Sequence, residues 1–320
     1  MNTQTDISLL VEVARLYYEH DYSQQQISEK LNISRPMISR FLTQARERGI
    51  VRITVMDPTG YGTKLEHELQ QHYQLKKAVV VPNEDLTENE LKTHLGRAAA
   101  GYLDQIITDD TTLGLAWGTT MQALIRQLQP KRVRNMKVVQ VIGGFTSGQF
   151  NTFANEIVQQ FAQVYQAESL LLPLPAIVDN VHLKKAMLTD RNMARVLDMA
   201  RDAQIVIFSI APFTPTAPLV RAQYFQQKEV EDLLNCGAVG DICTHIINAS
   251  GEICSQELEN RNLGLPLEDI KKKPYSIVVA GGQEKLSIIR AGLNGRCFNV
   301  LVTDEWTARQ LINEKLEAAA

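Results

Sequence analysis

The stretch SQQQISEKLNISRPMISRFL, residues 23–42, is rich in glutamine, serine and arginine, and its few apolar residues are regularly spaced. Ser23 and Ser34 are good N-cap residues, and each stands directly before a helical apolar pattern. The triplet 31–33, Leu-Asn-Ile, lies between the two patterns and breaks their register. The stretch therefore predicts two short helices joined by a tight turn.

The apolar spacing of this stretch is typical of a helix-turn-helix. The apolar residues that fall where the two helices of this motif pack together are Ile27, Leu31, Ile33, Ile38 and Phe41. Small Ser28 falls at the predicted helix crossing, and Asn32 falls in the turn, where asparagine tolerates a left-handed backbone. The combination is specific, although each element alone is a weak signal.

The second predicted helix, residues 35–48, presents polar and basic residues that can reach a major groove. The predicted DNA-binding residues of the motif are Ser23, Gln24, Ser34, Arg35, Pro36, Met37, Ser39, Arg40 and Thr43. Arg35 and Arg40 are the strongest candidates, because a guanidinium group binds guanine through two hydrogen bonds. Serine hydroxyls and helix N-terminal amides suit phosphate oxygens.

Charge is concentrated around this predicted helix. The whole chain of 320 residues has a formal net charge of -3. Residues 30–52, in contrast, contain six basic residues and one acidic residue. A three-helix bundle with a merely solvated basic face is the alternative, but the coincidence of the charge cluster with the turn pattern favours DNA binding.

The flanking segments predict a small all-α N-terminal domain. ISLLVEVARLYYEH, residues 7–20, has apolar residues at helical spacing and predicts a supporting helix. Gly49 is a good helix stop, IVRITV at 50–55 alternates like a strand, and MDPTG at 56–60 indicates a turn. We therefore predict two domains, residues 1–56 and 57–320.

Composition excludes several classes of protein. An apolar fraction of 44% and a charged fraction of 22% are ordinary for a globular protein. The longest apolar runs fall short of a membrane span, and the first residues lack a secretory pattern, so we expect a cytoplasmic protein without a membrane partner. The four cysteines and six histidines show no metal-ligand or nucleophile spacing, which predicts no metal site, no cofactor and no enzymatic activity.

From residue 77 onward, strand-like and helical segments alternate. KAVVVP at 77–82, TTLGLAW at 111–117 and MKVVQVIGG at 136–144 are examples of the strand-like segments. QIVIFSIA at 204–211 and GDICTHIIN at 240–248 are further strand candidates. The alternation predicts an α/β domain with a mainly parallel sheet covered by helices, in which ligands bind at the carboxyl ends of strands.

Three strand ends carry glycine and predict a phosphate-binding region. The residues concerned are Gly118, Thr119 and Thr120; Gly143 and Gly144; and Gly281, Gly282 and Lys285. Glycine permits close backbone approach, threonine hydroxyls and a positive helix end suit an anion, and lysine supplies a point charge. The alternatives are an ordinary strand-to-helix turn with a threonine cap and a lysine on a helix surface.

Two carboxylates extend this predicted site. Asp241 lies inside an otherwise apolar strand-like run, where a carboxylate needs a hydrogen-bonding partner such as a sugar hydroxyl. Asp304 lies at a strand end, where it either faces the ligand or caps the helix that begins near Trp306.

The chain resembles the SorC family of bacterial sugar-responsive transcription regulators, and within it the deoxyribonucleoside-regulator branch. Seven blocks carry the resemblance in the order that the family has: YSQQQISEKLNISRPMISRFLTQARERGIVRI, LGLAWGTTMQAL, VVQVIGGF, LPLPAIVDN, AVGDICTHIINASGEICS, SIVVAGGQEKLSIIRAGL and NVLVTDEWTA.

The resemblance implies an N-terminal DNA-binding domain and an effector domain related in fold to sugar-phosphate isomerases. It also implies operator DNA as a partner, a phosphorylated sugar as effector, and a homo-oligomer, either a dimer or a tetramer. Ile142 precedes the glycines of VVQVIGGF, and this segment contains no lysine that could form an imine with an aldehyde sugar. We therefore expect a non-covalently held sugar phosphate. The rival hypothesis is a sugar-phosphate enzyme with an accessory DNA-binding segment.

Overall fold

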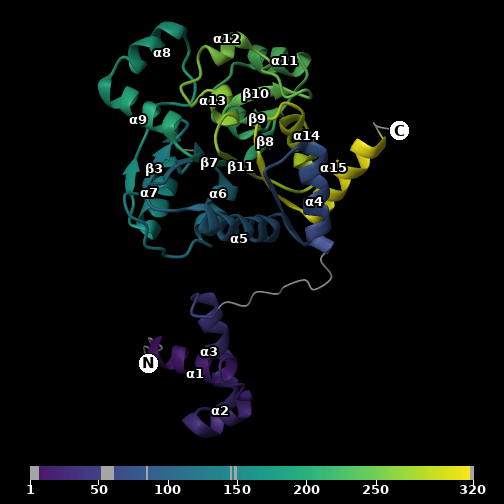
Figure 1. The fold of residues 1–320 in the computed structure, drawn as a ribbon. Coiled ribbons are helices and arrows are strands. Elements are labelled where there is room, and N and C mark those ends of the chain that lie inside the picture. Colours follow the sequence, from purple (N-terminus) through teal and green to yellow (C-terminus); the bar gives the residue numbers. More distant parts are fainter. Residues whose placement is uncertain (1–6, 52–60, 84–85, 145, 148–149, 318–320) are drawn as a thin grey trace. The chain divides into compact units, whose positions relative to one another are not determined.

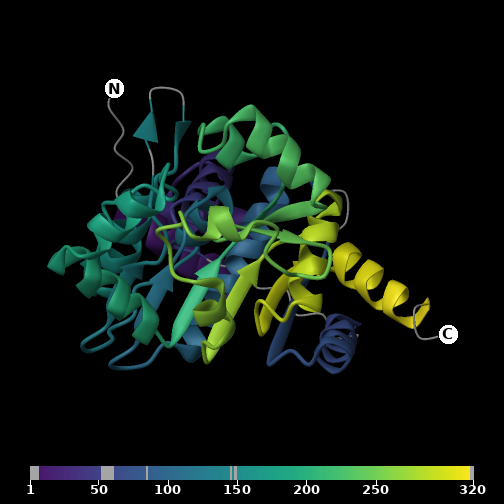
Figure 2. The ribbon, with the colours of Figure 1, turned by 90° about the horizontal axis from the view of Figure 1, so that it is seen from above.

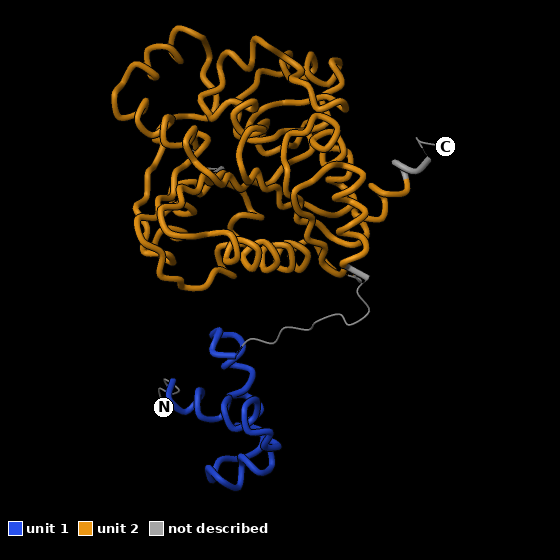
Figure 3. Tube along the Cα trace, in the orientation of Figure 1, with its two compact units in different colours: residues 1–59 blue, residues 60–320 orange. Residues whose placement is uncertain are grey.

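The computed structural model describes residues 7–51, 61–83, 86–144, 146–147 and 150–317. The chain divides into two compact units, residues 1–59 and 60–320 (Figure 3). The predicted domain boundary at residues 56–57 lies outside the described residues, and each unit is considered by itself below.

The described residues of the first unit form the helices α1 (Ile7–Tyr18), α2 (Gln24–Leu31) and α3 (Arg35–Glu47). Ser23 begins α2 with a reciprocal cap, in which the Gln26 amide donates to the Ser23 hydroxyl at 3.3 Å and the Ser23 amide donates to the Gln26 side chain at 2.9 Å. Asn32 ends the helix in the left-handed conformation, with φ 53° and ψ 42°. The predicted turn between two short helices is confirmed.

A small apolar core holds these helices together. Ile27 and Ile38 are completely buried, and Phe41 packs with them beside residues of α1. Leu31 and Ile33 are partly buried against the same core, as the helix-turn-helix pattern predicted. The strand predicted at 50–55 is not found in its first two residues, 50 and 51, and its remaining residues lie outside the described part of the chain.

A parallel sheet organises the second unit (Figure 1). In the described residues its order is β1-β12-β11-β7-β2-β3-β6, and every neighbouring pair is parallel. Its strands are β1 (Lys77–Val81), β2 (Thr112–Leu115), β3 (Lys137–Gln140), β6 (Glu168–Leu170), β7 (Ile205–Phe208), β11 (Tyr275–Val279) and β12 (Val300–Asp304). The predicted mainly parallel α/β architecture is confirmed.

Helices cover both faces of this sheet, because successive strand residues point to opposite faces and both sets are apolar. One face packs against α5 (Glu88–Ile106), α6 (Thr119–Ile125) and α7 (Ala154–Tyr165). The other packs against α4 (Tyr61–Tyr73), α9 (Arg191–Asp202), α14 (Leu286–Asn294) and α15 (Glu305–Glu317). Figure 2 shows α15 projecting away from the sheet toward the C-terminus.

A smaller antiparallel sheet joins β8 (Ile210–Pro212), β9 (Ala238–Ile242) and β10 (His245–Asn248) in the order β10-β9-β8. The segments predicted as the single strands QIVIFSIA and GDICTHIIN are therefore each divided in two. The second divides because Cys243 and Thr244 adopt left-handed φ values of 49° and 71°, and the Thr244 amide donates to the Asp241 carboxylate at 3.2 Å across the turn.

The remaining described elements surround these sheets. They are the hairpin β4 (Thr146–Ser147) and β5 (Phe150–Asn151), α8 (Val181–Leu188), α10 (Pro218–Arg221), α11 (Gln227–Asn235), α12 (Gln256–Glu259), α13 (Leu267–Lys271) and the 3₁₀ turn η1 (Gln283–Lys285). A membrane-spanning helix is not found among the residues described, since none of their helices combines the length and apolarity that a bilayer requires.

Candidate functional site

A cavity of about 580 Å³ lies at the carboxyl ends of parallel strands in the second unit. Its walls come from the segments that follow β1, β2, β11 and β12 and from the first two turns of α5. Among the predicted site residues, those that line it are Thr120, Gly281, Gly282 and Lys285. The sheet topology thus brings together residues that are 165 positions apart in the chain, at the edge where such sheets bind ligands.

Lys285 is the central cation of this cavity. Its ammonium group donates to the Ser209 hydroxyl at 3.1 Å, and that hydroxyl donates to the Thr120 hydroxyl at 3.2 Å. Burial, together with the charge of Lys92, lowers the pKa of Lys285 to about 8, while the charge of Asp241 opposes the shift. A lysine and two hydroxyls therefore form one polar row across the ends of β11, β7 and β2.

The loop after β11 is fixed by Asp304. This carboxylate is completely buried and accepts from the Gly282 amide at 2.7 Å, the Asn83 amide group at 2.7 Å and the Thr307 hydroxyl at 2.6 Å. A side chain on Gly281 would begin 2.2 Å from the same carboxylate, which explains the glycine there. The Thr307 backbone amide also donates to Asp304, at 3.1 Å. These hydrogen bonds are those of a residue that caps a helix, which was the second of the two roles predicted for Asp304.

Asp241 lies on β9 and is not among the described lining residues of this cavity, although its charge and that of Lys285 stabilise each other. Burial raises the pKa of Asp241 to about 6, although the hydrogen bond from the Thr244 amide and the charges of His245 and Lys285 act against the rise. An acidic group with a raised pKa beside a lysine with a lowered pKa is the kind of environment found at functional sites.

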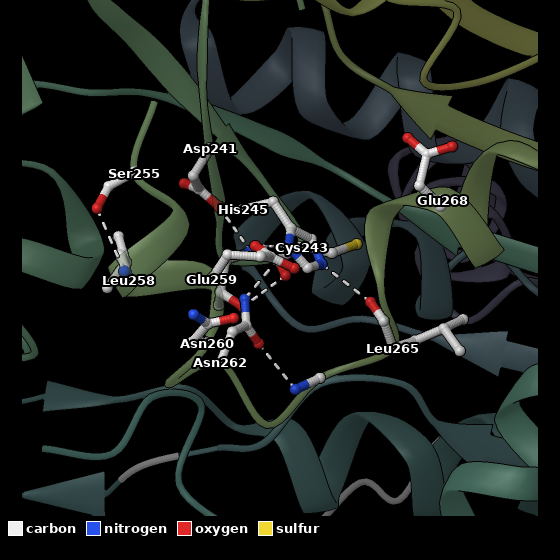
Figure 4. A network of polar contacts seen from close by, with 12 residues as sticks. Asp241, Cys243, His245, Ser255, Leu258, Glu259, Asn260, Asn262, Leu265 and Glu268 are labelled. Carbon is white, nitrogen blue, oxygen red and sulfur yellow. Dashed lines mark hydrogen bonds and ion pairs between the residues drawn. The ribbon is translucent and has the colours of Figure 1, made fainter. Parts of the chain in front are cut away.

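A buried polar network supports the turn that carries Asp241 (Figure 4). His245 is 1% exposed, and its Nδ1 lies 2.7 Å from Glu259 Oε2 while its Nε2 lies 2.9 Å from the Leu265 carbonyl oxygen. Each of these contacts joins a ring nitrogen to an oxygen, and each needs one proton to be a hydrogen bond. The imidazole ring and the Glu259 carboxylate together therefore carry two protons. Asn262 extends the network by donating to the Thr244 hydroxyl at 2.9 Å.

The glycine pair after β3 lies apart from the first cavity. Gly144 lines a second cavity of about 420 Å³ together with the start of α7. Gly143 packs under the Pro175 carbonyl, since a side chain there would begin 2.2 Å from that oxygen, and its own carbonyl accepts from the Trp117 indole at 2.8 Å. The described lining of the first cavity also leaves out Gly118 and Thr119, although Gly118 has the φ of 138° that glycine favours before α6.

The sequence did not indicate three of the candidate functional residues. Ser209 lies in a segment predicted as one apolar strand, His245 was considered only among six histidines without ligand or nucleophile spacing, and Lys92 was not singled out. A periodic pattern locates elements, but it does not reveal which polar residues of distant elements meet.

Most of the predicted DNA contacts are exposed, on α3 or at the residues before α2 and α3. Gln24 is half-buried. The other predicted contacts are exposed, namely Ser23, Ser34, Arg35, Pro36, Met37, Ser39, Arg40 and Thr43. The Thr43 hydroxyl donates to the Ser39 carbonyl at 3.2 Å, so part of its hydrogen-bonding capacity is used within α3. The exposed basic face of α3 is consistent with the predicted role, which stays a prediction for each residue.

Comparison with known proteins gives the family of the chain. The family described as "Putative sugar-binding domain" matches residues 58–313. The chain is 41% identical over 306 residues to the deoxyribonucleoside regulator of Bacillus subtilis (strain 168), covering 96% of this chain and 97% of that protein. It is 30% identical over 321 residues to the sorbitol operon regulator of Klebsiella pneumoniae, covering 98% and 100% of the two chains.

Solved structures agree with the sequence relatives. The full-length sorbitol operon regulator SorC from Klebsiella pneumoniae superposes with a TM-score of 0.79 at 30% identity, covering 96% of this chain and 99% of that one. A domain of a possible sugar-binding transcriptional regulator from Arthrobacter aurescens TC1 gives a TM-score of 0.72 at 26% identity, over 81% of this chain and 100% of that one. The chain therefore belongs to the SorC family of sugar-responsive bacterial transcription regulators.

Proposed function

We propose that this regulator binds a phosphorylated sugar in the cavity around Lys285 and binds operator DNA through α3, so that the sugar controls transcription of a sugar or sugar-alcohol catabolic operon. The observation that carries the proposal is the row of Lys285, Ser209 and Thr120 at the ends of three neighbouring strands. An ammonium group and hydroxyls are donors that suit phosphate oxygens, and the cavity of about 580 Å³ accommodates a small sugar phosphate.

The sugar moiety is proposed to contact Asp241, whose carboxylate accepts hydrogen bonds from hydroxyl groups. Binding is non-covalent at the glycine segment after β3, because Ile142 is buried at 3% exposure and offers no amine. We assign Gly281 and Gly282 to shaping the wall around the ligand, whereas Gly118, Thr119, Gly143 and Gly144 lie outside the described lining of this cavity. Asp304 contributes indirectly, by holding the Gly282 loop in place.

The proposed organisation is a DNA-binding domain at 1–56 and an effector-binding and oligomerisation domain at 57–320, assembled in the cytoplasm as a dimer or tetramer. An oligomer presents paired recognition helices to two half-sites, so a change in subunit arrangement alters their spacing. The effector must bind two states of the protein with different affinity to exert this control. A catalytic role is not proposed, and sugar phosphates are expected to be returned unchanged after incubation with the protein.

A thermal-shift screen tests the effector class. The purified full chain is melted with pentose, hexose and hexitol phosphates, each beside its unphosphorylated form, because a ligand that binds the native state stabilises it by mass action. We expect a large rise in melting temperature with one phosphate ester and none with its free sugar. Equal shifts with free sugars, or no shift with any phosphate, would remove the phosphate site.

A further inference from the structure

The first two turns of α5 contribute a second lysine to the cavity. Glu88, Leu91, Lys92 and Leu95 all line it, and this spacing places them on one face of the helix. The start of α5 is held by a reciprocal cap, in which the Glu90 amide donates to the Thr87 hydroxyl at 3.4 Å and Thr87 donates back to the Glu90 carboxylate. The helix therefore presents Glu88 and Lys92 to the cavity from a fixed end.

Lys92 forms an ion pair with Glu88 one turn away, at 2.5 Å between Nζ and Oε1. The two members differ in surroundings, since the Lys92 side chain is 19% exposed and the Glu88 side chain is 74% exposed. Lys92 is thus confined against the cavity wall, whereas Glu88 has room to turn toward solvent.

The charges of Lys92 and Lys285 meet in this cavity. The positive charge of Lys92 lowers the pKa of Lys285, and both lysines lower the pKa of Glu88. The Glu88 carboxylate therefore partly neutralises two cations that repel each other. A phosphate monoester carries a charge of about -1.5 to -2 at neutral pH and three acceptor oxygens, so it matches this pair of cations better than one carboxylate does.

We propose that Lys92 is a second phosphate-binding cation of the effector site and that Glu88 competes with the phosphate for it. Glu88 pairs with Lys92 in the absence of effector, and the phosphate replaces Glu88 when it binds. The proposal rests on the proposed function, because it assigns two further residues to the same site. The competition sets the affinity: the effector must displace Glu88, and the displaced carboxylate turns to solvent. It also selects doubly charged phosphates, since a carboxylate-bearing sugar acid replaces Glu88 without gaining a charge.

Two substitutions with opposite expected effects test this proposal. Lys92→Met removes a charge-assisted hydrogen bond, which is expected to raise the inorganic phosphate concentration for half-maximal thermal stabilisation by about tenfold. Glu88→Gln removes the competitor and is expected to lower that concentration severalfold. Because Glu88 also lies in the first turn of α5, Glu88→Gln is expected to lower the melting temperature without phosphate slightly, opposite to its effect on binding.

The chain offers a matched control on α4. Lys64 and Glu68 form another pair four residues apart, at 3.8 Å, and neither is among the described lining residues of the cavity. Lys64→Met and Glu68→Gln change the net charge in the same ways, and both should leave the phosphate response as in the wild type. All titrations are performed on the full chain at constant ionic strength, because screening alone changes exposed ion pairs.

The outcomes separate this proposal from the proposed function. If Lys285→Met weakens the phosphate response while Lys92→Met and Glu88→Gln leave it unchanged, the role of Lys92 and Glu88 is wrong and the phosphate site stands. If Glu88→Gln weakens binding as Lys92→Met does, the competition is wrong. If the wild type responds to neither inorganic phosphate nor any sugar phosphate, both the effector class and the role of Lys92 are wrong.

Discussion

At the scale of single residues, the region of the proposed effector site combines two groups whose charged forms are unfavourable for stability. Asp241 is held in surroundings that disfavour its carboxylate form, and Lys285 in surroundings that disfavour its ammonium form. A protein that needed only a stable core would replace both with apolar residues, because uncompensated buried charges are costly. Lys285 lines the cavity, and the polar ligand proposed there explains its presence.

Asp241→Asn is expected to stabilise the protein at neutral pH. The folded-state pKa of Asp241, about 6, lies above the ordinary value of 3.8, so the cost of the buried carboxylate is complete above pH 6 and disappears below about pH 4. Asparagine keeps an acceptor for the Thr244 amide and removes the charge. The gain in unfolding free energy should approach about 3 kcal/mol near neutral pH.

Melting temperatures of the wild type and of Asp241→Asn, recorded across the range between those two pKa values, give the check. The difference should shrink as the pH falls, and the variant should also bind the sugar phosphate less tightly. If Asp241→Asn is less stable than the wild type at neutral pH, the prediction that the buried carboxylate destabilises the fold is wrong.

The affinity for a phosphate ester is expected to fall as the pH rises through 8. Lys285 loses its proton near this pH because its pKa is lowered to about 8, whereas an ordinary lysine stays charged to about pH 10. Isothermal titration with the sugar phosphate found by the thermal-shift screen measures the dissociation constant across this range. Lys285→Met should bind weakly and show no such pH dependence; an unchanged slope would assign the titration to another group.

At the scale of elements, the helix α3 is the part of the molecule that is expected to read DNA. Arg40→Ala should weaken operator binding by roughly 1 to 3 kcal/mol and relax the preference at one base pair, because Arg40 is exposed on α3 and a guanidinium group can contact guanine. The operator is obtained by selection from random duplexes, and binding is measured by fluorescence anisotropy.

Arg15→Ala is the matched control for this substitution. Arg15 belongs to the same unit, is 67% exposed on α1 and makes an ion pair with Glu19 at 3.9 Å. Like Arg40→Ala, Arg15→Ala removes one positive charge, but from a helix that is not predicted to enter the major groove. Equal losses from Arg15→Ala and Arg40→Ala would mean that only the overall charge of the unit matters.

The same scale explains what the sequence can predict. The turn between α2 and α3 follows from local signals, since Ser23 caps its own helix and Asn32 alone accommodates the left-handed turn. The turn between β9 and β10 has no such signal, because Cys243 and Thr244 are held at positive φ by the Asp241 carboxylate and by distant Asn262. Predicting it as a continuous strand was wrong for this reason.

The candidate site shows the same limit. Thr120, Gly282 and Lys285 were predictable because each follows a strand of a parallel sheet, and such strand ends meet at one edge. Strand order was not predictable, and it is strand order that puts β7 between β11 and β2 and so places Ser209 between Lys285 and Thr120. The second cavity beside Gly144 likewise depends on packing against Pro175, which no local pattern encodes.

At the scale of the whole molecule, the proposed function requires that effector binding and DNA binding influence each other. By thermodynamic linkage, the factor by which the sugar phosphate changes operator affinity equals the factor by which operator DNA changes sugar-phosphate affinity. A change of about 5-fold to 150-fold is usual for such coupling. The two factors are measured independently, by anisotropy on labelled duplex with and without the sugar phosphate, and by calorimetric titration with and without duplex.

Lys285→Met is expected to separate the two activities. Its operator affinity without ligand should equal that of the wild type, since Lys285 and the Ser209 hydroxyl to which it donates both lie in the second unit. The sugar phosphate should no longer change that affinity, because the state that it stabilises loses its differential binding energy. A parallel loss of operator affinity without ligand would indicate damage to the fold, and a preserved response would mean that the phosphate is bound elsewhere.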